Sequence, residues 1–299
     1  DLYWMNDIWQ RMLAEIVPSG QPVGTLLPSV AEELGLPKSA LLVSGAHDQY
    51  AALLGAGITR AGEVLVGTGT AWVITALTDE PDFSSGFSQS IPAAGNWGSM
   101  VAISAGGVCL DWFRTGVASS EREGGLPYSE IDSIAAERNP GANGLFFYPY
   151  FNGGVFPLRN PDCKAAFLGL DLSHDRFDIA RAVMEGVAMQ AAWVLESFRQ
   201  KFPIPSLKLA GGASKSALWA QMVADIANCE VRTLTAFDLA PVGAAVMAGA
   251  GGGVFPSLEE GASRIEVGER IFSPDPARYA EHFRIFKRRA CALSELYRN

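Results

Sequence analysis

The pattern of apolar and polar positions predicts strands and helices over most of the chain. Three consecutive apolar runs of β type, at 63–66, 71–77 and 97–104, predict adjacent strands at the start of a sheet. Helices and strands then alternate, with helices predicted over 106–114, 176–198, 214–228 and 241–250, and strands over 144–150, 206–210 and 231–234. This order favours an α/β fold in which helices flank a mixed sheet.

The helix predicted over 176–198 has the clearest periodicity. Ile179 and Val183 begin a row of mostly apolar side chains on one face, and Asp175 with Asp178 provides an N-cap.

The first quarter of the chain has a different pattern. It predicts an amphipathic helix over 1–16, a short strand over 41–44, and then a helix of small residues. We place a domain boundary after this helix, which divides the chain into residues 1–58 and residues 59–299.

Composition restricts the class of protein. Of 299 residues, 48% are hydrophobic and 18% are charged, which is typical of a globular chain. The net charge of −9 disfavours binding to nucleic acids and to anionic membranes. The uncharged stretch 239–255 contains Pro241 and is too short and too weakly apolar to span a bilayer, so we expect a buried, tightly packed helix and loop there.

The four cysteines are far apart in the sequence and form no CxxC pair. We therefore expect free thiols, no zinc site, and a cytoplasmic location.

Three short segments could bind a ligand or carry chemistry. Gly67-Thr68-Gly69-Thr70 joins two predicted strands, where glycines would let backbone N–H groups turn toward a phosphate. An ordinary hairpin turn explains the same residues and is the commoner case.

The second segment, Gly211 to Ser216, lies between a predicted strand and a predicted helix. A glycine-rich turn at a helix N-terminus suits a phosphate or a ribose. The P-loop pattern fails, because its two glycines would have to stand at Leu209 and Ser214. A tight turn with Ser214 as the N-cap remains an equal alternative.

The third segment centres on Asp48, which follows a predicted strand and begins a helix. An aspartate there is most often an N-cap, but at the end of a strand it can also act as a general base on a substrate hydroxyl.

Taken together, these segments resemble the FGGY carbohydrate kinases. The resemblance rests on six stretches in the family's order: Gly45 to Gly57, Gly62 to Val73, Gly106 to Trp112, Ala165 to Glu185, Leu209 to Asp225, and Gly243-Ala244-Ala245. It implies an actin/hexokinase-like (ribonuclease H-like) ATPase domain and a phosphotransferase that carries the ATP γ-phosphate to a sugar or polyol hydroxyl.

The resemblance also implies roles for individual residues. Asp48 would be the catalytic base and Gln49 would lie beside the substrate. Thr68 would contact the terminal phosphates and Ser216 would lie near the adenine. The full nucleotide-binding set would be Gly67, Thr68, Gly69, Thr70, Gly107, Gly211, Gly212, Ala213 and Ser216. ATP and Mg²⁺ are the expected cofactors, no protein residue is assigned to the metal, and a homodimer is allowed.

Members of this family carry an N-terminal sugar-binding domain that opens with an Asp-x-Gly-Thr phosphate motif. We expect residues 1–58 to be a remnant of that domain and residues 59–299 to be the ATP-binding domain, so that the chain is a fragment inactive by itself. Two alternatives stay open: a non-catalytic actin-like nucleotide-binding module, and an acetate kinase-like phosphotransferase on the same fold.

Overall fold

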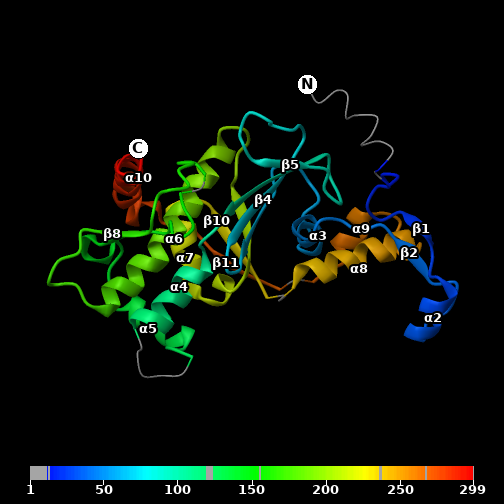
Figure 1. Ribbon diagram of the computed structural model, residues 1–299, viewed down its shortest axis with the longest axis horizontal. Helices are drawn as coiled ribbons and strands as arrows, with labels where there is room; N and C mark the ends of the chain where they lie inside the picture. Colours follow the sequence, from blue (N-terminus) through cyan, green and yellow to red (C-terminus); the bar gives the residue numbers. More distant parts are fainter. Residues whose placement is uncertain are drawn as a thin grey trace.

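The core of the protein is a seven-stranded mixed sheet with strand order β11-β10-β9-β3-β4-β6-β5 (Figure 1). The computed structural model describes residues 12, 14–118, 124–154, 156–235, 238–266 and 268–298. β3, β9 and β10 run parallel, and the other neighbours are antiparallel. The strands are β3 (Val64–Thr68), β4 (Trp72–Thr78), β5 (Ser88–Ser90), β6 (Trp97–Ile103), β9 (Ser206–Gly211), β10 (Glu230–Leu234) and β11 (Glu269–Phe272).

Helices cover both faces of this sheet. Successive side chains of its strands point to opposite faces and are apolar, so both faces must be buried. In β3, Val64 and Val66 belong to the cluster that contains the apolar side chains of α6 (Arg176–Arg199) and α7 (Ala217–Ala227). Leu65 instead packs with Tyr50 and Leu53 of α3 (Asp48–Gly55). Successive residues of a strand point to opposite faces, so one buried strand joins two separate cores.

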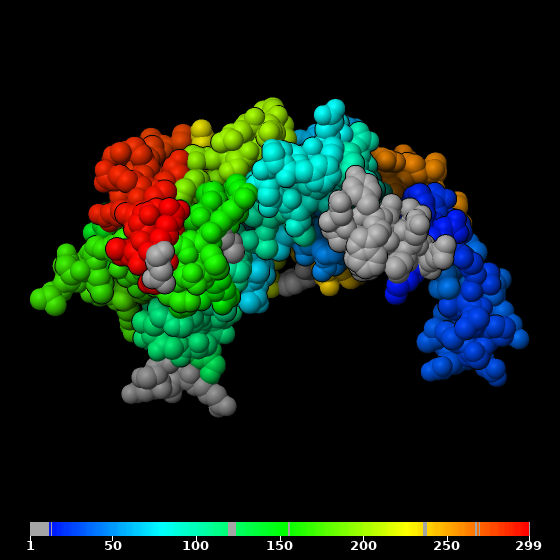
Figure 2. Space-filling model, turned by 45° about the horizontal axis from the view of Figure 1, so that its top comes forward, coloured from blue at the N-terminus to red at the C-terminus, as the bar shows by residue number. Residues whose placement is uncertain are grey.

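The remaining elements surround this layered centre. They are β1 (Pro22–Thr25), α2 (Pro28–Leu34), β2 (Leu41–Val43), α4 (Gly107–Trp112), the π-helical turn Phe113–Val117, α5 (Tyr128–Ala136), β7 (Phe146–Tyr148), β8 (Ala166–Leu168), α8 (Leu239–Gly251), α9 (Leu258–Ser263) and α10 (Ala280–Glu295). β1 pairs with β2 and β7 with β8 in two small antiparallel sheets. Figure 2 shows the blue segment that contains α2 projecting from the body of the molecule.

The predicted order of elements is confirmed for the central sheet, with differences at its margins. The segment predicted as a strand at 144–150 forms β7, which pairs only with β8 and lies outside the central sheet. The helix predicted over 1–16 falls almost entirely outside the described residues, and residues 14–16 are not helical. α10 was not predicted from the sequence, although Phe283, Phe286 and Leu293 are buried at helical spacing.

α3 and α8 touch at their backbones. A Cβ atom on Gly243 would lie 1.9 Å from the carbonyl oxygen of Ala51, and one on Gly55 would lie 2.0 Å from that of Leu239. Only glycine permits helices to approach this closely, which accounts for the small residues in the uncharged stretch at 239–255. That stretch forms α8 as predicted, but it is not buried as a whole, since only Leu239, Gly243, Val246 and Met247 of the helix are buried. None of the described helices combines the length and apolarity needed to cross a bilayer.

We predict that Gly243→Ala destabilises the protein, although alanine is the better helix former. Its methyl group would force α3 and α8 apart, at a cost of about 1–3 kcal/mol for an overpacked site. Chemical denaturation monitored by circular dichroism measures this loss. Gly116→Ala is the matched control, since a Cβ atom there meets nothing within 4 Å. Equal stability of the two variants would contradict the proposed contact.

Candidate functional site

Thr68 joins the β3–β4 hairpin to the glycine-rich turn that follows β9. Its hydroxyl donates to the carbonyl oxygen of Ala210 at 2.7 Å and accepts from the amide of Ala213 at 3.0 Å. Its carbonyl oxygen accepts from the amide of Gly212 at 2.8 Å. Two segments 142 positions apart in the sequence, which we predicted to share a ligand, are therefore in direct contact.

Gly211 is required at this junction for two reasons. Its φ of +98° lies in the region that favours glycine, and a Cβ atom would stand 2.8 Å from the carbonyl oxygen of Thr68. The parallel pairing of Thr68 with Gly211 then brings the end of β9 against the hairpin.

The start of α4 is the third segment at the hairpin. The amide of Gly107 donates to the carbonyl oxygen of Gly69 at 3.0 Å, and the amides of Gly106 and Val108 donate to that of Thr70 at 3.1 and 3.2 Å. The segments predicted to converge around a nucleotide therefore do meet at one hairpin.

The turn of the hairpin is shorter than we expected from the sequence. β3 continues through Gly67 and Thr68, so the turn comprises only the residues between Thr68 and Trp72. Thr68 is 3% exposed, and its hydroxyl proton is already engaged by Ala210. The main effect of this side chain is to hold the turn together, and its contact with a phosphate stays a prediction. Gly69 and Thr70 are exposed at the tip.

Asp48 is the first residue of α3, one position later than an N-cap. His47 occupies the N-cap position, and its Nδ1 atom accepts from the amide of Gln49 at 3.3 Å. The Oδ1 atom of Asp48 accepts from the same amide at 2.7 Å. The side chain of Asp48 is 70% exposed, so its carboxylate can reach a ligand.

A cleft of about 330 Å³ brings Asp48 and the hairpin together. It is lined by Asp48, Gln49, Ala52, Leu65, Gly67, Thr68, Gly69, Ala71, Val73, Ala210, Gly211, Asp238, Leu239 and Ala240. Six of the predicted site residues lie in this wall. Five predicted site residues do not line it: Thr70, Gly107, Gly212, Ala213 and Ser216. Each of them either neighbours a lining residue or belongs to the turn that follows Gly211. Asp238, an exposed acid just before α8, also lines the cleft and was not predicted from the sequence.

Two helices begin at this cleft. α3 starts with Asp48 and α8 starts with Leu239 and Ala240, all of which are lining residues. The first-turn amides of a helix have no partner within the helix and carry partial positive charge, which favours an anion. The cleft therefore combines a carboxylate with backbone donors suited to phosphate oxygens.

Comparison with known proteins agrees with this geometry. The C-terminal-domain model of the FGGY family of carbohydrate kinases matches residues 63–251, which is more than half of the chain. The chain belongs to the FGGY family.

Relatives in this family are longer than the chain. A gluconokinase of Bacillus subtilis (strain 168) is 30% identical over 79% of the chain and 48% of its own length. A xylulose kinase of the same strain is 31% identical over 99% of the chain and 59% of its own length. The chain thus spans about half the length of the curated relatives it matches.

The fold agrees with that of solved FGGY structures. A xylulose kinase from Lactobacillus acidophilus superposes with a TM-score of 0.88 at 21% identity, covering 99% of the chain and 61% of that protein. The predicted actin/hexokinase-like fold is therefore confirmed.

A second and larger cavity, of about 1040 Å³, opens at the opposite ends of the central strands. Its wall includes Glu63, Thr78, Lys201 and Ser206, and none of the predicted site residues. Volume alone does not identify an active site, and the smaller cleft is the one that six of the predicted site residues line.

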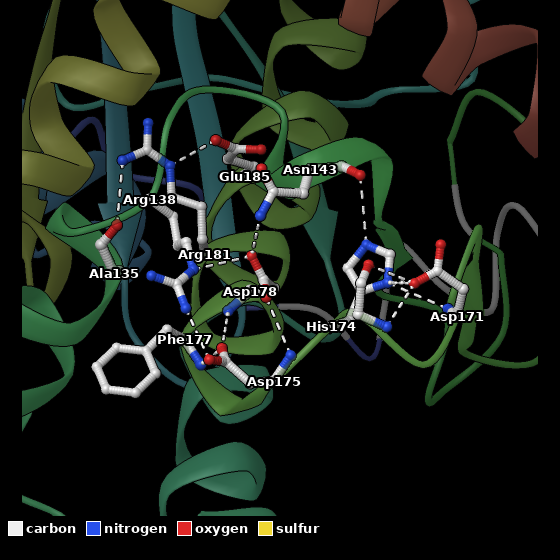
Figure 3. A network of polar contacts seen from close by, with 11 residues as sticks. Ala135, Arg138, Asn143, Asp171, His174, Asp175, Phe177, Asp178, Arg181 and Glu185 are labelled. Carbon is white, nitrogen blue, oxygen red and sulfur yellow. Dashed lines mark hydrogen bonds and ion pairs between the residues drawn. The ribbon is translucent and has the colours of Figure 1, made fainter.

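The FGGY stretch at 165–185 has a structural role. Asp175 is the N-cap of α6, as predicted, and it forms a capping box with Asp178. Asp178 is buried and accepts from Nε of Arg138 at 3.0 Å and from Nδ2 of Asn143 at 2.7 Å (Figure 3).

About two turns further along α6, Glu185 is the centre of a second group of buried polar contacts. It accepts from Nε of Arg181 at 2.6 Å and from the hydroxyl of Tyr279 at 2.8 Å, and burial raises its pKa. These acids hold the segment before β7 and the start of α10 onto α6, away from the cleft.

Ser216 is the N-cap of α7, so the alternative in which Ser214 caps this helix is wrong. The turn Ala213–Lys215 is a 3-10 helix, which delays the start of α7 to Ala217. The Oγ atom of Ser216 accepts from the amide of Trp219 at 3.0 Å and donates to Oδ1 of Asp132 at 2.8 Å. Asp132 lies on α5, an element that the sequence analysis did not predict.

We predict that Thr68→Val weakens both the fold and the binding of nucleotides. Valine keeps the shape of threonine but leaves the carbonyl of Ala210 and the amide of Ala213 without their partner, at a cost of about 1–3 kcal/mol. Thr68→Ser, which keeps the hydroxyl, is the control and should lose less. Thermal unfolding and ATP titration compare the two. A valine variant as stable as the serine variant would show that the hydroxyl does not hold the turn.

Proposed function

We propose that the protein containing this chain transfers the γ-phosphate of ATP to a hydroxyl group of a sugar or polyol. The observation that carries this proposal is the cleft in which Asp48 and Gln49 face the glycine hairpin and Gly211. The relatives named gluconokinase and xylulose kinase support an acceptor with several hydroxyl groups. Free cysteine thiols, three of them buried, support a reducing compartment such as the cytoplasm.

In this proposal Asp48 is the general base. Its exposed carboxylate stands at the start of α3 with one oxygen held by the amide of Gln49. The carboxylate would accept the proton of the substrate hydroxyl as that hydroxyl attacks the phosphorus atom. Proton transfer to a positioned base contributes about 10²–10⁴-fold to a rate.

Gln49 would orient the acceptor. Its Oε1 atom lies 3.8 Å from the position of a Cβ atom on Gly67, so the side chain bridges the space between α3 and the hairpin. An amide at this point can both donate to and accept from a substrate hydroxyl.

The hairpin and the two helix starts form the phosphate end of the proposed site. Phosphoryl transfer depends mainly on positioning and on stabilising the charge of the transferred group. The lining residues include no lysine or arginine. Hydrogen-bond donors for the phosphates would instead come from the exposed backbone at Gly69 and from the first-turn amides of α3 and α8. This agrees with an acidic protein that nevertheless binds a polyanion.

Mg²⁺ is compatible with these residues. The described residues contain no group of three or more histidine, cysteine, aspartate or glutamate side chains that could hold a metal ion. Mg²⁺ bound with a nucleotide usually takes only one or two protein carboxylates and draws other oxygens from phosphates and water. Asp238, the acid that lines the cleft at the start of α8, would hold it, and it would neutralise charge on the phosphates.

We further propose that residues 1–58 belong to a second, substrate-binding lobe. Leu41 and Leu42 of β2 are 50% and 44% exposed, and the neighbouring Leu27 and Leu34 are exposed as well. Apolar side chains on a short strand are usually covered, so this surface suits a contact with further parts of the protein. The backbone contact of α3 with α8 then ties the lobe to the rest of the chain.

We predict that Asp48→Asn abolishes most of the kinase activity without unfolding the protein. Asparagine keeps an oxygen for the amide of Gln49 but cannot accept the substrate proton. We expect kcat to fall about 10²–10⁴-fold with nearly unchanged affinity for ATP. A coupled kinase assay on the full-length protein measures kcat, and a titration with ATP measures the affinity for the nucleotide.

Asp162→Asn provides the control for this experiment, because it removes an exposed carboxylate outside the cleft. It should leave kcat unchanged. If Asp48→Asn keeps more than about a tenth of the wild-type kcat, far above the rate expected without a base, the catalytic assignment is wrong.

A further inference from the structure

Two polar atoms beside the larger cavity have no hydrogen-bond partner. Thr78 is the last residue of β4 and lines this cavity of about 1040 Å³, and its Oγ1 atom is buried and unpaired. The Nε2 atom of Gln89 in β5 is also buried and unpaired. Among the described residues only four side-chain nitrogen or oxygen atoms are in this condition, and such atoms are costly unless a water molecule or a ligand pairs with them.

Thr78 and Gln89 belong to one row of polar side chains across three strands. Ser99 of β6 pairs with Ala76 of β4 on one side and with Gln89 of β5 on the other. Thr78 lies two positions after Ala76, so Thr78, Ser99 and Gln89 point to the same face of the sheet. Ser99 also lines the cavity, and its hydroxyl donates to Oε1 of Gln89 at 2.9 Å. The cavity therefore has two hydroxyl groups in its wall and, behind them, an amide that can still donate.

Another part of the wall is aromatic. Phe87, Phe198 and Phe202 line the cavity, and the rings of Phe87 and Phe198 are stacked with their centroids 4.4 Å apart. The ring of Phe202 lies 6.1 Å from that of Phe198, and Phe202 is only half-buried. Sites for small molecules combine such apolar surface with a few polar groups that fix the orientation of the ligand.

The charged side chains of the wall nearly balance each other. Four of them are acids and three are bases: Glu63, Asp79, Glu80 and Asp82, and Lys201, Lys208 and Arg232. Lys201 is paired with Asp82 at 3.0 Å, and Glu63 accepts from two backbone amides. A wall of this kind has no marked preference for an anion or for a cation. It matches a ligand whose groups both donate and accept, which is the property of a hydroxyl group.

We propose that this cavity binds a neutral, polyhydroxylated molecule, a sugar or a polyol, at a second site away from the cleft. Hydroxyl groups of the ligand would pair with Thr78 and with charged side chains of the wall, and its C–H groups would pack against Phe202. Oγ1 of Thr78 is covered in its present rotamer, and another staggered χ1 rotamer would turn it toward the ligand. The cavity shares no lining residue with the cleft around Asp48, so binding here does not depend on the proposed kinase activity.

The test is equilibrium dialysis of the full-length protein against radiolabelled xylitol, a neutral polyol. We expect a dissociation constant in the millimolar range, about the affinity of a small ligand of ordinary efficiency. Thr78→Val keeps the shape of the side chain but removes its hydroxyl, and it should weaken this binding about three- to tenfold. Because Oγ1 has no partner among the described residues, the same variant should lose no stability in chemical denaturation.

Thr78→Ser is the matched control, because it keeps the hydroxyl at the same backbone position and should bind xylitol as tightly as the wild-type protein does. Any binding of xylitol at the cleft is common to the three proteins, so the difference between their titrations measures the cavity. Inorganic phosphate is a second control. It should not displace xylitol from the site that Thr78→Val weakens, because the charges of the wall do not favour an anion.

The other outcomes would overturn the proposal. If the wild-type protein binds no xylitol, or Thr78→Val binds it as tightly as wild type does, water or another part of the protein fills the cavity. Equal weakening in Thr78→Ser would show that the effect is one of packing, and displacement by phosphate would show a site for anions. The kinase activity of the wild-type protein is measured separately, so none of these results decides the proposed function.

Discussion

The hydrogen bonds of Thr68 are the constraint on which the candidate site depends. The buried hydroxyl of Thr68 and the backbone carbonyl group of the same residue hold the end of β9, and the turn after it, against the β3–β4 hairpin. The tip of the same hairpin receives the start of α4 through the carbonyl groups of Gly69 and Thr70. Three segments distant in the sequence thus share one backbone framework, and the glycines at their junctions leave no side chain in the way.

The opposite wall of the cleft depends on a different close contact. Gly55 and Gly243 let α3 and α8 meet backbone to backbone, so that both helices start at the cleft. Asp48 and Asp238 stand at these two starts, which sets acids beside amides that favour anions. A phosphate and a proton acceptor can therefore occupy one small space. The acids Asp178 and Glu185 of α6, in contrast, make buried contacts with Arg138 and Arg181, and these contacts stabilise the part of the chain around α6.

Much of the fold could be predicted because β3, β4, β6, β9 and β10 are apolar enough to give clear patterns. The elements that were missed are short or lie at the margin, such as α5 and β11, where few buried side chains carry the pattern. Among site residues, Asp48, Gln49 and the glycine hairpin were recognised because each belongs to a recurring motif. Asp238 belongs to no such motif, and an isolated acid just before a helix has the same local pattern as a solvated surface residue.

By itself the sequence determined the α/β class, the order of the central strands along the chain, and the motif residues of an FGGY protein, since periodicity and glycine positions are local properties. Only the tertiary structure decided that the buried side chain of Thr68 holds two segments together, that Ser216 contacts Asp132, and that Asp238 joins Asp48 at one cleft. The physical reason is that these contacts are set by strand pairing and helix packing between segments at least 84 positions apart. A hydrogen bond between segments so far apart leaves no trace in the local sequence of either one.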